Sequence, residues 1–157
     1  MLGSDELRAW RDATLYRLVF RASRAERTET LRRLHERGWL DVTLADTGLL
    51  ANLDTEGTSI SALARRAGVT RQAASQQVAT LEREGYVTRR PDRSDARATV
   101  VRQTAKGRRL LADAIDVVAM IEAEYARHIG AKRLGALKEQ LRVLLDHIDP
   151  EGTLGQD

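Results

Sequence analysis

One short stretch of the chain carries polar but uncharged side chains where a solvated helix usually carries Lys and Glu. At about 100° of rotation per residue, Gln72, Ser75 and Gln76 lie opposite the apolar side of a predicted helix. Glutamine can pair with adenine through two hydrogen bonds, and serine can bond to the edge of several bases. Arg71 adds a positive charge at the start of this helix. These four side chains could therefore read base edges in the DNA major groove, although ordinary polar surface helices can show the same pattern.

Two short helices joined by a glycine turn are predicted to position these residues. Ser59 can cap the first helix, and Gly68 tolerates the positive φ that ends a helix in a sharp turn. Thr70 can cap the second helix. The inward apolar stripe of the second helix consists of Ala74, Val78 and Leu81. This is the pattern of a helix-turn-helix, whose second helix enters the major groove.

A basic hairpin is predicted directly after the second helix. Residues 86–90 and 98–103 are strand-like, and residues 91–95 have turn chemistry. Arginine side chains on a narrow protrusion suit the minor groove and its phosphates, and Asp95 can pair with a neighbouring arginine to hold the hairpin in shape. The arginines concerned are Arg89, Arg90, Arg93 and Arg97. The alternative is a charged hairpin that is merely solvated.

Positive charge is concentrated on this part of the chain. Residues 65–109 contain twelve Lys or Arg and four Asp or Glu, a net charge of +8. The whole chain carries +3, so the remainder carries −5. An average solvated surface does not require such segregation, whereas a surface that binds phosphates does.

A specific pattern runs through the hairpin, or wing, and the residues that follow it. It consists of Asp92, Asp95 and Arg97 in the wing and of Thr104, Lys106 and Gly107, a Thr-x-Lys-Gly helix start. In this pattern the chain resembles the MarR family of bacterial transcriptional regulators. Nearly the whole chain is covered. The resemblance implies a mainly α-helical fold with a small β-hairpin wing, in which a winged helix-turn-helix is flanked by N- and C-terminal dimerisation helices.

Two positions depart from the family pattern. Ala96 stands where the family usually has a basic residue, which bears on how strongly the wing grips DNA. Gln103 replaces the usual leucine before Thr104, and we expect this change to affect local packing only.

The domain organisation follows from the resemblance and from the apolar periodicity. We expect an N-terminal dimerisation region over 1–40, the winged helix-turn-helix over 41–103, C-terminal dimerisation helices over 104–150 and a frayed tail over 151–157. The N-terminal region predicts one long helix, or two helices with a bend near Ser23. Thr43 and Asp46 predict the start of a short helix with a capping box.

The two ends of the chain are predicted to form a dimer. The last helix has a narrow seam with 3-4-3-4 spacing, which favours contact with another helix. Its members are Leu134, Leu137, Leu141, Leu144 and Ile148. The resemblance implies that the terminal helices of two chains intertwine. The alternative is that they cover the core of a monomer.

The resemblance also implies a pocket between the dimerisation helices and the winged module for a small aromatic or anionic effector. No other cofactor is expected. The candidate lining residues are Trp10, Tyr16, Arg17, His35 and Trp39. The alternative for the aromatic residues is that they fill the core.

Other functions find little support in the composition. The chain has no cysteine, which excludes disulfides and thiolate-bound zinc, and its three histidines are scattered. Catalytic motifs are absent, so we expect no enzymatic activity. The start of the chain lacks the pattern of a signal peptide, and no apolar run reaches about eighteen residues. We therefore expect a cytoplasmic protein, associated with the bacterial nucleoid when it is bound to DNA, and no membrane partner.

Together these observations predict a ligand-responsive, sequence-specific transcriptional regulator. Its partners would be double-stranded DNA, a second copy of the chain and a small-molecule effector. Repression of a pseudo-palindromic operator is the expected outcome, because a two-fold dimer carries two reading helices. The alternatives are a winged-helix module that acts through protein–protein interaction, or DNA binding that needs no effector.

Overall fold

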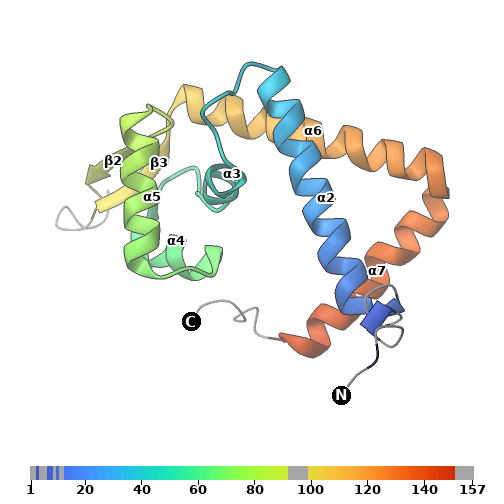
Figure 1. Ribbon diagram of the computed structural model, residues 1–157. Coiled ribbons are helices and arrows are strands. Elements are labelled where there is room, and N and C mark those ends of the chain that lie inside the picture. The colour runs from blue at the N-terminus through green and yellow to red at the C-terminus, as the bar shows by residue number, and fades with distance from the viewer. Residues whose placement is uncertain (1–2, 4–6, 9, 11–12, 92–98, 151–157) are drawn as a thin grey trace.

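The structure, a computed structural model, is mainly helical with a small antiparallel sheet, as the sequence predicts (Figure 1). It describes residues 3, 7, 8, 10, 13–91 and 99–150 of the 157. The elements within this part are α2 (Leu15–Glu36), α3 (Leu44–Ala51), β1 (Thr58–Ser59), α4 (Ile60–Ala67), α5 (Arg71–Arg83), β2 (Val87–Pro91), β3 (Thr99–Gln103), α6 (Ala105–Ile129) and α7 (Ala131–Ile148). None of the helices within these residues is long and apolar enough to cross a membrane.

The elements divide into two groups that α6 connects (Figure 1). Helices α4 and α5 lie with the β2–β3 hairpin at one end of the molecule, and α2 and α7 lie towards the other. Helix α6 packs against both α2 and α7. The positive φ of Gly130 ends α6, and the chain turns back into α7 there.

The predicted caps position the helix-turn-helix. The hydroxyl of Ser59 accepts from the amide of Ala62, and that of Thr70 accepts from the amide of Ala73. Gly68 has a φ of 63° and ends α4 in the left-handed conformation. The capping box of Thr43 and Asp46 is also present at the start of α3. The local signals therefore set the ends of these helices as expected.

The sheet has one strand more than the sequence predicts. Strand β3 lies between β1 and β2, and Arg89 is opposite Val101 in the register. Strand β1 has two residues, too few to show an alternating pattern, which is why the sequence did not indicate it. Its Thr58 pairs with Val101, so the short strand joins the start of α4 to the wing.

A continuous core joins α2, α3, the winged module and α6. The fully buried side chains include Leu34, Leu49, Leu50, Leu63, Leu81, Leu110, Val117 and Ile121. Burying a side chain of this size contributes about 1.5–3 kcal/mol to folding. The helix-turn-helix and the hairpin are therefore held by the same core that holds the middle of the chain.

The bend expected near Ser23 is wrong. Helix α2 runs through Ser23 without a break, and the interruption lies at Thr14, whose backbone is extended. Leu7, Trp10 and Ala13 before it are helical. The Thr14 hydroxyl donates to the carbonyl of Trp10 at 3.0 Å, a local hydrogen bond that competes with a continuing helix.

Helix α7 differs from the other helices because it has no buried residue. It is held to α6 by Lys138, whose ammonium lies 2.9 Å from the carboxylate of Glu122. Leu137 is 51% exposed and Ile148 is 61% exposed, so much of the predicted seam is uncovered in one chain.

Candidate nucleic-acid interface and ligand groove

The exposed face of α5 carries the side chains predicted to read DNA. Gln72 and Gln76 are one turn apart and both are exposed, and Arg71 is exposed in the first turn. The opposite side of α5 is fixed in the core by Ala74 and Val78. A buried inner stripe therefore holds a polar, solvent-facing row in a defined direction.

Ser75 lies at the edge of this face. It is half-buried, and its carbonyl accepts a long hydrogen bond of 3.5 Å from the guanidinium of Arg89 on β2. Gln77 faces the other way, because its amide nitrogen donates to the carboxylate of Asp46 on α3 at 3.4 Å. Of the polar residues in this part of α5, Gln72 and Gln76 are the best placed for contact with a ligand in solution.

Arg83 belongs to the same exposed face, and the sequence analysis missed it. From Gln72 the spacing runs 4-3-4 through Gln76 and Ala79 to Arg83, so these residues follow one side of the helix. Ala79 and Arg83 are both exposed. The spacing was present in the sequence and could have identified Arg83 as a positive charge at the far end of the reading face.

The two described arginines of the wing have different surroundings. The backbone amide of Arg89 donates to Glu82 of α5 at 2.9 Å, and its guanidinium lies 3.4 Å from the same carboxylate. Arg89 therefore ties β2 to α5, a contact that the sequence did not predict and that competes with its expected role at phosphates. Arg90 is exposed on the outer part of β2. Arg93, Asp95 and Arg97 lie outside the described residues.

The five residues predicted to line one effector pocket fall into two groups. Trp10, Tyr16 and Arg17 cluster near the start of α2, where the rings of Trp10 and Tyr16 are 6.5 Å apart and Arg17 lies 5.7 Å from the Trp10 ring centre. His35 lies near the other end of α2. At 1.5 Å of rise per residue, Tyr16 and His35 are separated by roughly 28 Å along the helix. Within one chain, the structure therefore does not bring these residues together around one small pocket.

Trp39 is part of the edge of the core. Its indole nitrogen donates to the carboxylate of Asp113 on α6 at 2.7 Å. Its ring lies 6.1 Å from that of Tyr86, and it packs against the buried cluster. Trp39 therefore joins α6 to the winged module, which corresponds to the core-filling alternative for the aromatic residues.

A groove is present instead between α2, α3 and α6. Its volume is about 510 Å³, and its lining consists mainly of small and aliphatic side chains, with Glu26 and Arg27 as the charged members. The lining residues are Glu26, Arg27, Thr30, Leu44, Thr47, Gly48, Ala51, Leu111, Ala114, Ile115 and Val118. These residues come from three helices and share no local pattern, so the sequence did not indicate the groove.

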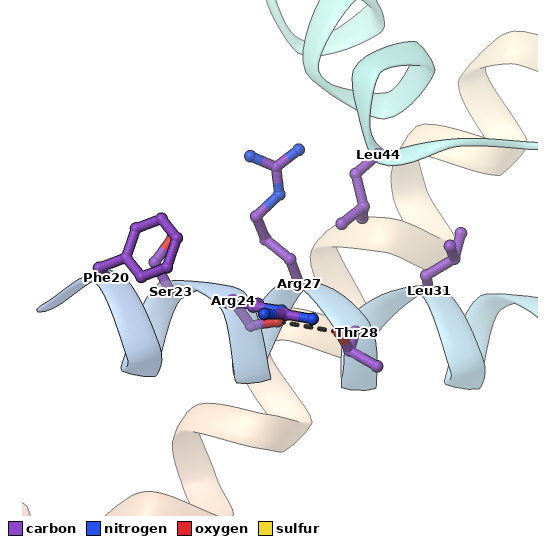
Figure 2. A pocket seen from close by; sticks show the side chains of 7 residues that line it. All are labelled: Phe20, Ser23, Arg24, Arg27, Thr28, Leu31 and Leu44. Carbon is purple, nitrogen blue, oxygen red and sulfur yellow. Dashed lines mark hydrogen bonds between the residues drawn. The ribbon is translucent and has the colours of Figure 1, made fainter. Parts of the chain in front are cut away.

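A second hollow of about 460 Å³ adjoins the groove along α2 (Figure 2). It shares Arg27 and Leu44 with the groove, and Phe20 and Arg24 line its far part. Figure 2 shows the side chain of Arg27 extending from α2 towards the level of Leu44. An apolar groove is thus continuous with a surface that carries two arginines.

Other arginines of α2 are paired with carboxylates. Arg33 binds Glu124 of α6 through two hydrogen bonds of 2.8 and 2.7 Å and also contacts Glu29. The hydrogen bonds that Arg33 donates to Glu124 and Glu29 raise the pKa of Arg33. Arg37 pairs with Asp116 of α6 at 2.5 Å. Among the residues that the structure describes, no ion pair involves Arg24 or Arg27. Arg33 and Arg37 are therefore neutralised by carboxylates, whereas Arg24 and Arg27 have no carboxylate partner among the described residues.

Comparisons with known proteins agree with this architecture. A family model described as the MarR family matches residues 40–98. A MarR family protein of Mycobacterium tuberculosis, solved with salicylic acid, is 32% identical; the alignment covers 85% of this chain and 97% of that one, with a TM-score of 0.64. No curated protein sequence matches the chain.

Two structures of CouR are also similar. The transcriptional repressor CouR bound to a 23-mer DNA duplex is 26% identical, with 92% of this chain and 98% of that chain covered and a TM-score of 0.71. CouR from Rhodococcus jostii RHA1 bound to p-coumaroyl-CoA is 22% identical, with 87% and 92% covered and a TM-score of 0.69.

The fold and the exposed reading helix define a winged helix-turn-helix of the kind found in transcriptional regulators. The relative from M. tuberculosis is similar over almost its entire length. The chain belongs to the MarR family, whose members are winged-helix, DNA-binding transcriptional regulators that act as dimers.

Proposed function

We propose that this protein is a ligand-responsive, sequence-specific repressor that binds a pseudo-palindromic operator as a homodimer in the bacterial cytoplasm. The observation that carries the proposal is the exposed row of Gln72 and Gln76 on a helix whose other side is fixed in the core. Amide side chains in such a row can recognise base edges, and Arg71 and Arg83 add positive charge at the two ends of the helix.

The uncovered apolar side chains support a dimer built from the two ends of the chain. Leu144 and Ile148 on α7 are exposed, as are Leu18 and Phe20 on α2. Apolar surface of this extent is usually covered by a partner. A two-fold dimer would present two α5 helices to half-sites about one helical turn of DNA apart.

The groove between α2, α3 and α6 supports a ligand response. Its apolar lining suits an aromatic or acyl group, and Arg24 and Arg27 provide positive charge without a partner carboxylate among the described residues. Glu26 offsets part of this charge. We therefore expect an amphipathic anion as effector. The dimer could adopt two forms that differ in the distance between the two α5 helices, only one of which fits the operator. A ligand that binds the other form more tightly would increase its population and so release the DNA.

The test of the DNA-binding proposal begins with selection of a bound site from genomic DNA fragments. Fluorescence anisotropy at two salt concentrations then compares this site with a scrambled duplex. We expect tight, salt-sensitive binding that prefers the selected site. Equal weak binding to both duplexes at both salt concentrations would overturn the proposal of a sequence-specific regulator.

Gln76→Ala tests the assignment of the reading face. We expect a loss of discrimination of about 1–3 kcal/mol at one base pair of each half-site, because one amide contact is removed. The matched control is Gln140→Ala on α7, an exposed glutamine far from α5 in sequence. Unchanged base preference in Gln76→Ala would show that α5 does not read the site through this residue.

A further inference from the structure

The Thr-x-Lys-Gly sequence at the start of α6 does more than begin a helix. The Thr104 hydroxyl accepts from the amide of Gly107 at 3.1 Å, which is the cap of α6. The same hydroxyl donates to the carbonyl of Gly85 at 2.7 Å, and the Thr104 amide donates to the carbonyl of Tyr86 at 2.9 Å. Gly85 and Tyr86 directly follow α5. One residue therefore starts α6 and binds the backbone at the end of α5.

Lys106 binds the end of α5 itself. Its ammonium donates to the carbonyl of Glu84, the residue that caps α5 at its C-terminal end, at 2.9 Å. It also lies 4.1 Å from the centre of the Tyr86 ring. The last carbonyls of a helix lack intrahelical partners and carry partial negative charge, so a cation stabilises them. The aromatic ring adds a cation–π contact.

Gly107 allows the two segments to approach this closely. A Cβ atom at this position would lie 2.1 Å from the carbonyl oxygen of Tyr86, which is far inside the contact distance. That carbonyl belongs to the backbone and cannot turn away as a flexible side chain could. The first turn of α6 thus rests on the backbone that leaves α5.

Gln103 adds α3 to the same junction. Its amide nitrogen donates to the carbonyl of Leu50 at 2.8 Å, near the C-terminal end of α3. The sequence analysis had expected this departure from the family pattern to affect local packing only. The contact is a directed hydrogen bond between elements 53 residues apart. We call Gln103, Thr104, Lys106 and Gly107 the clasp.

The clasp adds hydrogen bonds between elements whose main packing partners differ. Helix α5 packs mainly against α4 and β2, which are both within the winged module. Helix α6 packs against α2, α3 and α7, and α3 and α6 both line the groove. In the part of the chain that the structure describes, the hydrogen bonds of the clasp join the end of α5 directly to the start of α6.

We propose that the clasp fixes the orientation of α5 relative to α6. Lys106 is then a positioning residue, because this orientation sets the distance between the two α5 helices of a dimer and therefore the operator spacing that the dimer binds. In the dimer, the distance between the two α5 helices is then set by α6. Residues 84–86 do not act as a hinge that would let α5 turn to fit half-sites at another distance. Movement of α3 or α6 around an occupied groove reaches α5 through the same contacts. The part that concerns DNA rests on the proposed function.

The first experiment measures the α5–α6 geometry without DNA. Because the chain has no cysteine, Ala79→Cys on α5 and Ala112→Cys on α6, both exposed, introduce the only two thiols for spin labels. Excess unlabelled chain ensures that a dimer carries one labelled copy. We expect one narrow distance distribution, which broadens at least about twofold in Lys106→Met, a variant that keeps an apolar stem but loses the hydrogen bond to Glu84.

Arg109→Met is the matched control, because it removes the same charge from the first turns of α6 at an exposed residue outside the clasp. We expect its distance distribution to match that of the wild type. Gly107→Ala is a second test of the same contact, and circular dichroism and thermal melts establish which variants are folded. A folded Lys106→Met with an unchanged narrow distribution would overturn the proposal.

The second experiment asks whether the clasp sets operator spacing. Inserting two base pairs between the half-sites rotates one against the other by roughly 70°. We expect the wild type and Arg109→Met to lose at least about tenfold in affinity, and Lys106→Met to lose much less, because its reading helices can adapt. Equal losses in all three proteins would refute the positioning role. A variant whose fold is merely weaker would lose affinity for the original operator and for the altered operator alike, so the ratio of the two affinities would match that of the wild type. If no protein prefers any site, the proposed function fails, and the distance measurement still decides whether the clasp fixes α5.

Discussion

The winged module buries its apolar side chains within one chain, whereas the terminal helices leave many of theirs exposed. Leu63 of α4 and Leu81 of α5 are completely buried within one chain. Helix α7 buries no residue, and Leu137 on its seam is 51% exposed. The reading head is therefore complete in a single chain, whereas the region that would set the distance between two heads requires a second copy. In the proposed dimer, recognition by α5 and the distance between the two α5 helices would therefore depend on different regions, which the clasp connects.

Two alanine substitutions, one in each region, should give the largest difference, and the quantity to compare is the free energy of unfolding. Leu63→Ala should lower the free energy of unfolding by about 2–5 kcal/mol, because it leaves a cavity in the core. This loss should not depend on protein concentration. Leu137→Ala should destabilise more strongly on dilution, since its contacts would lie between chains. Denaturant unfolding at several protein concentrations measures both, and an equal, concentration-independent loss in the two variants would contradict the comparison.

A charge on the seam should separate the chains while leaving each reading head folded. Leu144→Asp would place a carboxylate on the predicted interface, where burial without a partner is costly. We expect a shift from dimer to monomer in analytical ultracentrifugation and a loss of about 100-fold in affinity for a two-half-site operator. Gln140→Asp, an exposed substitution on the same helix, is the control. A variant that remains dimeric with full affinity would place the interface elsewhere.

The groove lies where the two regions meet, and its positive charge can be tested separately. Arg27→Met keeps the length and the apolar stem but removes the guanidinium that extends from α2. We expect affinity for DNA to change less than about twofold, whereas the concentration of an amphipathic aromatic carboxylate needed to release DNA should rise about tenfold. Arg142→Met on α7 is the charge-matched control. An unchanged release concentration in Arg27→Met would exclude Arg27 as an anion contact.

The smallest effect concerns Glu29, which pairs with Arg32 and Arg33 within α2. Hydrogen bonds from Arg32 and then Arg33 lower the pKa of Glu29 from 4.5 to about 2. A carboxylate whose pKa is lowered by folding stabilises the fold above its unfolded pKa, and this contribution disappears as the pH falls from about 4.5 towards 2. Glu29→Gln should therefore reduce the loss of Tm over this range. Glu139→Gln on α7 is the control, and identical Tm profiles for wild type and Glu29→Gln would show that the pair contributes nothing measurable.

The elements that the sequence predicted well depend on nearby residues. The caps at Ser59, Thr70 and Thr104 each use a hydroxyl and an amide three residues away. Periodicity likewise identified the inward stripe of α5 and, by elimination, the exposed Gln72 and Gln76. Of the two alternatives for the N-terminal region, the bend near Ser23 is wrong, because α2 runs through Ser23 and the interruption lies at Thr14.

The contacts that the sequence did not predict join residues far apart in the chain. Arg89 meets Glu82 because β2 returns along α5, and Lys106 reaches Glu84 across 22 residues only after the wing has formed. The groove uses side chains from three helices. The residues predicted to line one pocket are also far apart within a chain, because Tyr16 and His35 lie near opposite ends of α2.

The amino-acid sequence alone determined the helix-turn-helix, the exposed polar face of α5 and the apolar seam along α7, because helix caps and side-chain periodicity act within a few residues. Only the tertiary structure decided which arginines of α2 are neutralised, where the groove lies and how α3, α5 and α6 meet at the clasp. These features depend on the distances between packed elements, and such distances are set by the whole core.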